Sequence, residues 1–395
     1  MASTMMLHLW YSAFLPSSLM QSLQSKVFPV IQNFLKSKSS ESSVSLEGTW
    51  SHNKATLSAM LPREEWEKVL SYFRGTSNIS FDDAVAVRKS VTLAPSRRDY
   101  VDRAIFRLPP SWRLCQQKFR GDGVLLPFGA SRESFMVPNP TFFQDNPSWP
   151  MPDSADPLDG WKLSEVLQAT YPAKNDLYGQ LYLHIRQDLL KFCQRLTTLK
   201  LSIYALQVNA VQLPGHISRL RGGKQLYDRI GLANIADRAY LGAVDTLSTF
   251  GPLLKPKTQN PKATLLTLFL NATHEMCTLA DQKASFTRSI GTLQKFLPIN
   301  PQTILKGNTL SAESLAFMNA YSMFIDGDTI FNRFVNVAGL KKLGDSLGLG
   351  MKSTQTIVAK WPMRLNENPT QREFEMLYWS GHVGSERYVE WHRTR

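Results

Sequence analysis

Cysteine is scarce in this sequence, with three among 395 residues. Cys115, Cys193 and Cys277 lie far apart, with no CxxC pair and no neighbouring histidine cluster. This spacing argues against a disulfide framework and against a structural zinc site, and it favours a reducing compartment. We therefore expect a cytoplasmic protein that binds no metal.

Long apolar runs are also missing. No stretch approaches the roughly 18 to 20 uninterrupted apolar residues of a membrane helix. The apolar start, Met1 to Phe14, lacks a basic region and soon reaches Pro16, so it does not resemble a signal peptide. The sequence predicts a soluble protein with no membrane partner.

Glycine-rich cofactor loops are absent as well. No GxGxxG or GxGxG follows an expected strand, and the sequence contains no Walker loop and no HExxH. Dinucleotide binding is therefore disfavoured, and S-adenosylmethionine binding has no support. We expect no cofactor.

Basic residues are abundant, with 45 Lys and Arg against 32 Asp and Glu, for a formal charge of +13. Such a surface favours polyanions, although a generally basic surface without a site has the same composition. Arg88 to Arg120 holds nine basic residues interleaved with aromatics, a pattern suited to single-stranded nucleic acid. The alternative is an amphipathic segment with core aromatics and solvated charges. The segments Arg88 to Arg120 and Arg186 to Lys224 together contain the candidate phosphate contacts, which are Arg97, Arg98, Arg103, Arg107, Arg113, Lys191, Arg195, Arg219, Arg221 and Lys224.

Two helices have clear signals. Pro62 and two glutamates begin one, and apolar residues at steps of three or four predict another from Leu177 to Leu199. Strands are expected at 201–208, 226–235 and 262–271 and in the apolar run 123–128, with a crossover helix at 242–254. The order resembles the later half of a class I methyltransferase fold. We expect an α/β protein with a Rossmann-like, mostly parallel sheet and helical additions at both termini.

The expected domains are three. Residues 1–120 form a basic helical or mixed region, and residues 121–300 form the Rossmann-like core with a Pro/Asp-rich loop at 138–172. Residues 301–395 form a helical region, although the aromatic and charged run 374–391 has no clear period.

Candidate site residues fall in two regions. Ser131 follows an apolar run and a glycine, which suits either a nucleophile or a cap. Asp153, Asp156 and Asp159 crowd the Pro/Asp-rich loop, where carboxylates suit either a guanidinium or turn formation. Open α/β sheets bind ligands at strand ends, and the candidates for such a mouth are Asp176, Tyr178, Asn234, Asp237 and Tyr240.

Several long phrases resemble one fungal family of unknown function, which also occurs attached to MYND zinc fingers and is related to dynein-arm assembly factors. They are HLWYSAFLP, VTLAPSRRDYVDRAIF, LLPFGASRESF, NPTFFQ, DSADPLDGW, NDLYGQLYLHIRQDLLKFCQRL, YDRIGLANIADRAYLG and TFGPLLKPKTQNPKATLLTLFLNA, spread from His8 to about Ala272. The MYND cysteine and histidine pairs are not present here.

Stand-alone proteins similar to this family include the arginine-containing cyclodipeptide synthases, which use arginyl-tRNA and a second aminoacyl-tRNA. The resemblance implies tRNA-dependent peptide-bond formation, with the three loop aspartates recognising arginine and the mouth residues near the chemistry. It leaves open the second amino acid, a covalent aminoacyl-enzyme and the oligomeric state. Two alternatives remain: a non-catalytic scaffold with a degraded methyltransferase-like fold, and a working methyltransferase.

Overall fold

The chain folds as two compact units, Met1–Gln207 and Val208–Arg395. The structure, a computed structural model, describes residues 1–39, 45–74, 79–143, 148–306, 311–366, 368–380 and 384–394. The sequence predicts domain boundaries after residues 120 and 300. The boundary between the two compact units falls after residue 207. Residues 144–147 of the expected Pro/Asp-rich loop lie outside the described part.

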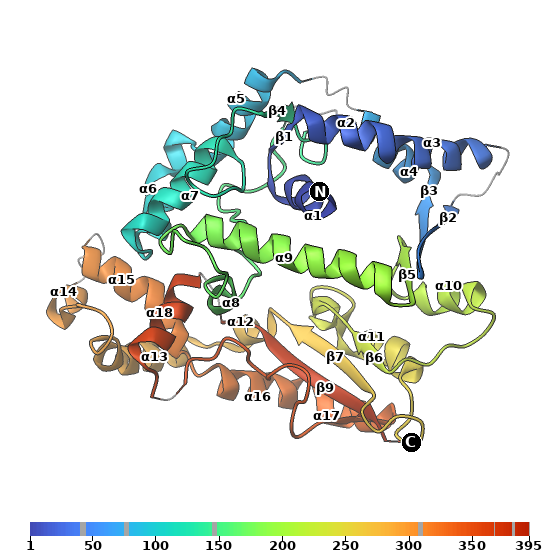
Figure 1. Cartoon of the computed structure of the whole chain (residues 1–395). Helices are drawn as coiled ribbons and strands as arrows, with labels where there is room; N and C mark the ends of the chain where they lie inside the picture. The colour runs from blue at the N-terminus through green and yellow to red at the C-terminus, as the bar shows by residue number, and fades with distance from the viewer. Residues whose placement is uncertain are drawn as a thin grey trace. The chain divides into compact units, whose positions relative to one another are not determined.

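The first unit is mainly helical, and its longest helix, α9, runs along α1 (Figure 1). Its helices are α1 (Ala2–Tyr11), α2 (Ser17–Lys26), α3 (Phe28–Ser37), α4 (Arg63–Arg74), α5 (Phe81–Thr92), η1 (Pro95–Arg97), α6 (Arg98–Phe106), α7 (Pro110–Asp122), α8 (Leu163–Val166) and α9 (Leu177–Thr198).

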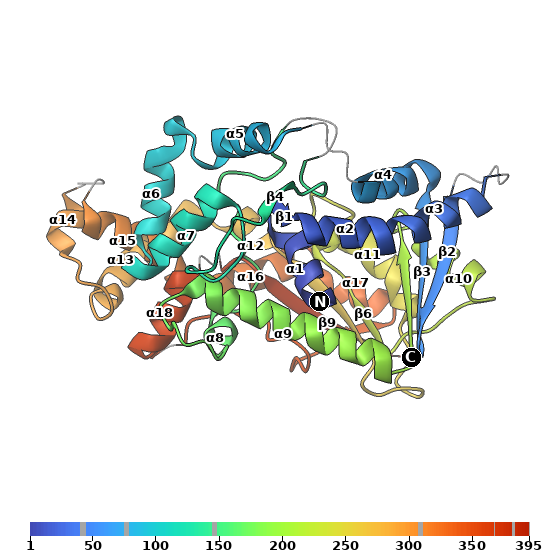
Figure 2. The same cartoon turned by 45° about the horizontal axis from the view of Figure 1, so that its top comes forward.

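Two small sheets complete this unit. Strand β1 (Phe14–Pro16) pairs antiparallel with β4 (Phe135–Pro138). In the second sheet, β3 (Ala55–Pro62) lies between β2 (Ser45–His52), which is antiparallel to it, and β5 (Leu201–Leu206), which is parallel. Helices α3 and α4 lie beside β2 and β3 in Figure 2, and their apolar side chains bury one face of this sheet.

Local signals explain several helix ends. Helix α4 follows Pro62 and has Glu64 and Glu65 in its first turn, where acidic groups favour the helix dipole. Helix α7 ends at Gly123, whose φ of +74° is the left-handed conformation that glycine adopts without strain. Both helices predicted from the sequence, α4 and α9, are confirmed.

The second unit has one four-stranded mixed sheet. Its strand order is β6-β7-β9-β8, and only β6 and β7 are parallel. The strands are β6 (Arg229–Gly231), β7 (Thr264–Phe269), β8 (Leu349–Met351) and β9 (Arg387–Arg393).

The other elements of this unit are helices. Those before β7 are α10 (Leu213–Leu220), η2 (Asn234–Ala236), α11 (Gly242–Phe250) and η3 (Gly251–Leu253). Those after it are α12 (Ala272–Met276), α13 (Leu279–Leu293), α14 (Pro301–Leu305), α15 (Ala312–Ala320), η4 (Tyr321–Phe324), α16 (Gly327–Val337), α17 (Leu340–Ser346) and α18 (Gln371–Ser380). The apolar core joins the sheet to α11, α16 and α17.

The α/β class is confirmed, but the described residues show no Rossmann-like parallel sheet. The three strands expected in one sheet separate, because β5 pairs with β3 of the first unit while β6 and β7 lie in the second. Strand β9 comes from the segment without a clear period and pairs antiparallel with β7 (Figure 1). The long-range pairing of β9 with β7 therefore makes this sheet mixed rather than parallel.

The strand predicted at 123–128 is wrong, because this run has no strand pairing and follows the end of α7 as an irregular segment. The predicted crossover helix at 242–254 is present as α11 and η3. Among the described residues, no helix combines the length and apolar character needed to cross a bilayer.

Candidate functional site

The first unit contains a cavity of about 190 Å³. Its wall comes from α1, α5, α7 and the loop after β4, which the fold brings together from distant parts of the chain. Most of the wall is apolar, and its charged side chains are Arg88 and Asp156. The complete lining is Trp10, Tyr11, Ala13, Arg88, Thr92, Phe119, Gly123, Phe142, Trp149, Met151, Pro152, Ala155, Asp156 and Pro157.

Asp156 is the acidic group of this cavity. Its Oδ1 accepts hydrogen bonds from the Tyr178 hydroxyl and from the Leu158 backbone N–H, both at 2.8 Å, and its Oδ2 accepts one from Gln116 Nε2. These donors are all neutral, and the positive charge of Arg107 acts to lower the pKa of the carboxyl. Burial raises the pKa of Asp156 above its usual value. A cationic ligand is the partner that would favour its charged form.

Tyr178 and Asp159 extend this acidic cluster. Tyr178 is 4% exposed, and burial together with the neighbouring Asp156 raises the pKa of its hydroxyl well above 10. Asp159 is exposed as a residue, but partial burial of its carboxyl and the nearby charge of Asp156 raise its pKa to about 6. A carboxyl with this pKa exchanges protons near neutral pH, as general acid–base catalysis requires.

Asp176 positions Tyr178 rather than facing the cavity. Its Oδ1 accepts from the Gly179 backbone N–H at 2.8 Å and caps the start of α9. Its Oδ2 accepts from the Phe128 backbone N–H at 2.7 Å, which ties the segment after α7 to α9. This buried carboxylate therefore has a structural role in fixing the helix that carries Tyr178.

Asp153 lies in the same loop but pairs with another residue. Its Oδ2 accepts from Arg97 Nε at 2.9 Å, and this hydrogen bond lowers the pKa of Asp153. Its backbone carbonyl accepts from Arg120, which also donates to the Thr92 carbonyl. Two arginines thus hold the wall of the cavity in place.

Arg88 and Arg120, at the two ends of the basic segment, are buried, so these two side chains do not lie on a surface where phosphates could contact them. Arg88 is 2% exposed, and its two Nη atoms donate to the carbonyls of Arg120 and Phe119 at 2.8 Å. A cation there satisfies the free carbonyls at the end of α7. Burial lowers the pKa of Arg88 to about 10, which leaves it charged at neutral pH.

Most of the other predicted phosphate contacts have partners within the chain. Arg97, Arg98, Arg103 and Lys191 pair with aspartates. Arg113 donates to the Leu108 and Phe106 carbonyls, and Arg219 to that of Gly215. Arg107 and Arg221 also interact within the chain. Arg195 and Lys224 are exposed. Surface ion pairs contribute little, so phosphates can compete for the paired side chains.

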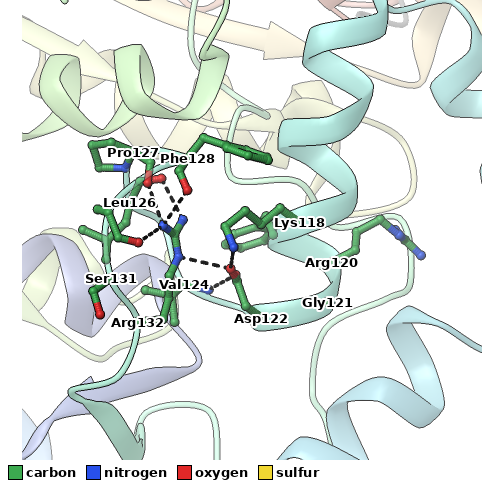
Figure 3. Close-up of polar contacts among 12 residues, drawn as sticks. Lys118, Arg120, Gly121, Asp122, Val124, Leu126, Pro127, Phe128, Ser131 and Arg132 are labelled. Carbon is green, nitrogen blue, oxygen red and sulfur yellow. Dashed lines mark hydrogen bonds and ion pairs between the residues drawn. The ribbon is translucent and has the colours of Figure 1, made fainter. Parts of the chain in front are cut away.

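Ser131 is exposed, and its Oγ accepts from the Glu133 backbone N–H at 3.2 Å in a local turn. Its neighbour Arg132 holds the irregular segment, because its guanidinium donates to the carbonyls of Pro127 and Leu126 and pairs with Asp122 (Figure 3). The Ser131 side chain points away from this cluster in Figure 3. No helix begins at Ser131, so its hydroxyl stabilises a local turn before β4.

The other three mouth candidates lie in the second unit. Asp237 is 1% exposed, and its Oδ2 accepts from the backbone N–H groups of Leu270 and Asn271 just after β7. Asn234 begins η2, and Tyr240 is 63% exposed. Asp156, Asp159 and Tyr178 therefore belong together, whereas these three form a separate group.

The sequence did not point to several residues of this site. Gln116 contacts Asp156 from α7 without any motif, and the lining residues Tyr11 and Trp149 lie in segments that read as core or loop. The described residues contain no group of three or more His, Cys, Asp or Glu side chains arranged to hold a metal.

Comparisons of the chain with protein-family models, with curated proteins and with solved structures gave no match in any of the three.

Proposed function

We propose that this protein is an aminoacyl-tRNA-dependent cyclodipeptide synthase that joins an arginyl group to a second aminoacyl group. The observation that carries the proposal is the carboxylate of Asp156, a half-buried residue in the wall of a largely apolar cavity. Apolar walls suit the methylene chain of arginine, and a carboxylate suits its guanidinium, which forms paired hydrogen bonds to carboxylates.

The chemistry requires positioning and proton transfer. An amine attacks the carbonyl carbon of an aminoacyl ester, the ester C–O bond breaks, and the tRNA hydroxyl leaves with a proton. A second such step closes the ring and releases the other tRNA. The ester bonds arrive activated, so no ATP is consumed. Asp159, with a pKa of about 6, suits the acceptance of the amine proton at neutral pH.

The charge of the chain supports a tRNA substrate. The formal charge of +13 favours a polyanion, and the phosphate backbone dominates nucleic-acid affinity. Exposed basic side chains such as Arg195 and Lys224 are the free candidates for phosphate contacts. Binding should therefore weaken as salt rises.

The test is incubation of the purified protein with arginyl-tRNA and a mixture of other charged tRNAs, followed by mass spectrometry. Cyclic dipeptides containing arginine are expected, and ribonuclease added before the protein should abolish them. Product that forms despite ribonuclease would refute the dependence on tRNA. Absence of product with the complete set of charged tRNAs would favour the non-catalytic scaffold.

A further inference from the structure

Two buried donors in the cavity wall have no acceptor among the residues that the structure describes. They are Nε of Arg88 and Nε1 of Trp149, and both residues line the cavity. They are neighbours, because the Arg88 guanidinium lies over the Trp149 ring, 5.3 Å from its centroid. Buried donors without partners are rare and cost free energy, so a pair in one cavity wall calls for an explanation.

The surrounding structure fixes both donors. The Nη atoms of Arg88 are occupied by the carbonyls at the end of α7, which leaves Nε as its unused donor. Gly123 lets the guanidinium lie close to the backbone, because a Cβ there would stand 2.8 Å from Nε. The Trp149 ring stacks on Phe142 with centroids 5.2 Å apart. In this arrangement neither donor atom is exposed to solvent.

We propose that Arg88 and Trp149 form an acceptor subsite, which binds the carbonyl oxygen of the ligand whose cationic end pairs with Asp156. This inference rests on the proposed function for the cationic end and adds the second point of recognition. The ligand class is then an ester or amide of a cationic amino acid. A small side-chain shift, common when ligands bind, brings the oxygen to the two donors.

Two probes separate the subsites. Agmatine carries the guanidinium and an amine but no carbonyl, whereas L-arginine methyl ester carries both groups and an ester carbonyl. Calorimetric titration of the full chain should show tighter binding of the ester. One hydrogen bond from a neutral donor corresponds to about threefold to tenfold in affinity.

The variant Trp149→Phe keeps most of the ring and removes the donor. It should weaken ester binding by about threefold to tenfold and leave agmatine binding unchanged. Trp50→Phe is the matched control, because Trp50 belongs to the core beside β2 and does not line the cavity. Arg88→Lys provides a second variant, which keeps the charge but lacks the Nε donor.

The outcomes are distinct. If the ester and agmatine bind wild-type protein equally, or if Trp149→Phe leaves their ratio unchanged, the acceptor subsite is refuted while the cation site stands. If neither probe binds at millimolar concentration, both subsites are refuted. Failure of the proposed function appears separately, as absence of product from charged tRNAs.

Discussion

Replacing Asp156 by asparagine should remove cation binding without harming the fold. Asparagine keeps the oxygen that accepts from Tyr178 and Leu158 and places an amide nitrogen where Oδ2 accepts from Gln116. The Gln116 side chain can then turn over, because its Oε1 has no partner and becomes the acceptor of the new donor. The variant also removes a buried charge. We therefore expect its free energy of unfolding to be unchanged or higher.

The Asp156→Asn variant should bind a cationic ligand more weakly. A hydrogen bond to a charged group contributes about 1.5–3 kcal/mol, so agmatine affinity should fall by about 10-fold to 150-fold. Calorimetric titration measures the affinity, and thermal unfolding measures the stability. Asp153→Asn is the control from the same loop, because Asp153 pairs with Arg97 and does not line the cavity. Wild-type affinity in the Asp156 variant, or an equal loss in the control, would refute the assignment.

Three further predictions follow from single groups. Because the Asp159 carboxyl ionises at a pKa of about 6, agmatine affinity should rise from pH 5 to pH 7, and a titration series with Asp159→Asn should lose that rise. Although burial acts to raise the pKa of Glu390, hydrogen bonds from three backbone N–H groups and Lys352 lower it to about 2. The stability that Glu390 supplies, up to about 3 kcal/mol, is therefore present above about pH 4.5 and lost toward pH 2, and acid unfolding of Glu390→Gln should lack this loss. Gly327→Ala should destabilise the protein by about 1–3 kcal/mol in denaturant unfolding, because the new methyl group would overlap the buried Arg387 side chain, whereas Gly291→Ala meets nothing and should not.

Each unit contains a buried arginine. In the second unit Arg387 is 1% exposed, lies over the Trp361 ring at 4.0 Å and donates through Nη1 to the Gly384 and Glu386 carbonyls. Arg88 in the first unit has the same arrangement of an aromatic face and backbone carbonyls. The formal charge of +13 therefore includes arginine side chains that a partner at the surface would not contact.

The sequence by itself determined the elements whose signals are local. Proline and two glutamates begin α4, apolar side chains at steps of three or four define α9, and β-rich runs give β5 and β7. The crowding of Asp153, Asp156 and Asp159 in one loop is also visible in the sequence, and Asp156 lines the cavity. Each of these features depends on neighbours within about one or two turns of chain, which is the range over which propensity and periodicity act.

Only the tertiary structure decided which of these elements meet. Strand β5 pairs with β3, although about 140 residues separate them, and β9 inserts beside β7 from a segment with no periodic signal. The Tyr178 hydroxyl donates to Asp156 and does not lie at the strand ends. Arg88 is buried against the end of α7, although the basic composition of its segment suggested a surface contact. These contacts form between groups that are distant in the sequence. Their free energy depends on the whole fold, so no local stretch of sequence predicts them.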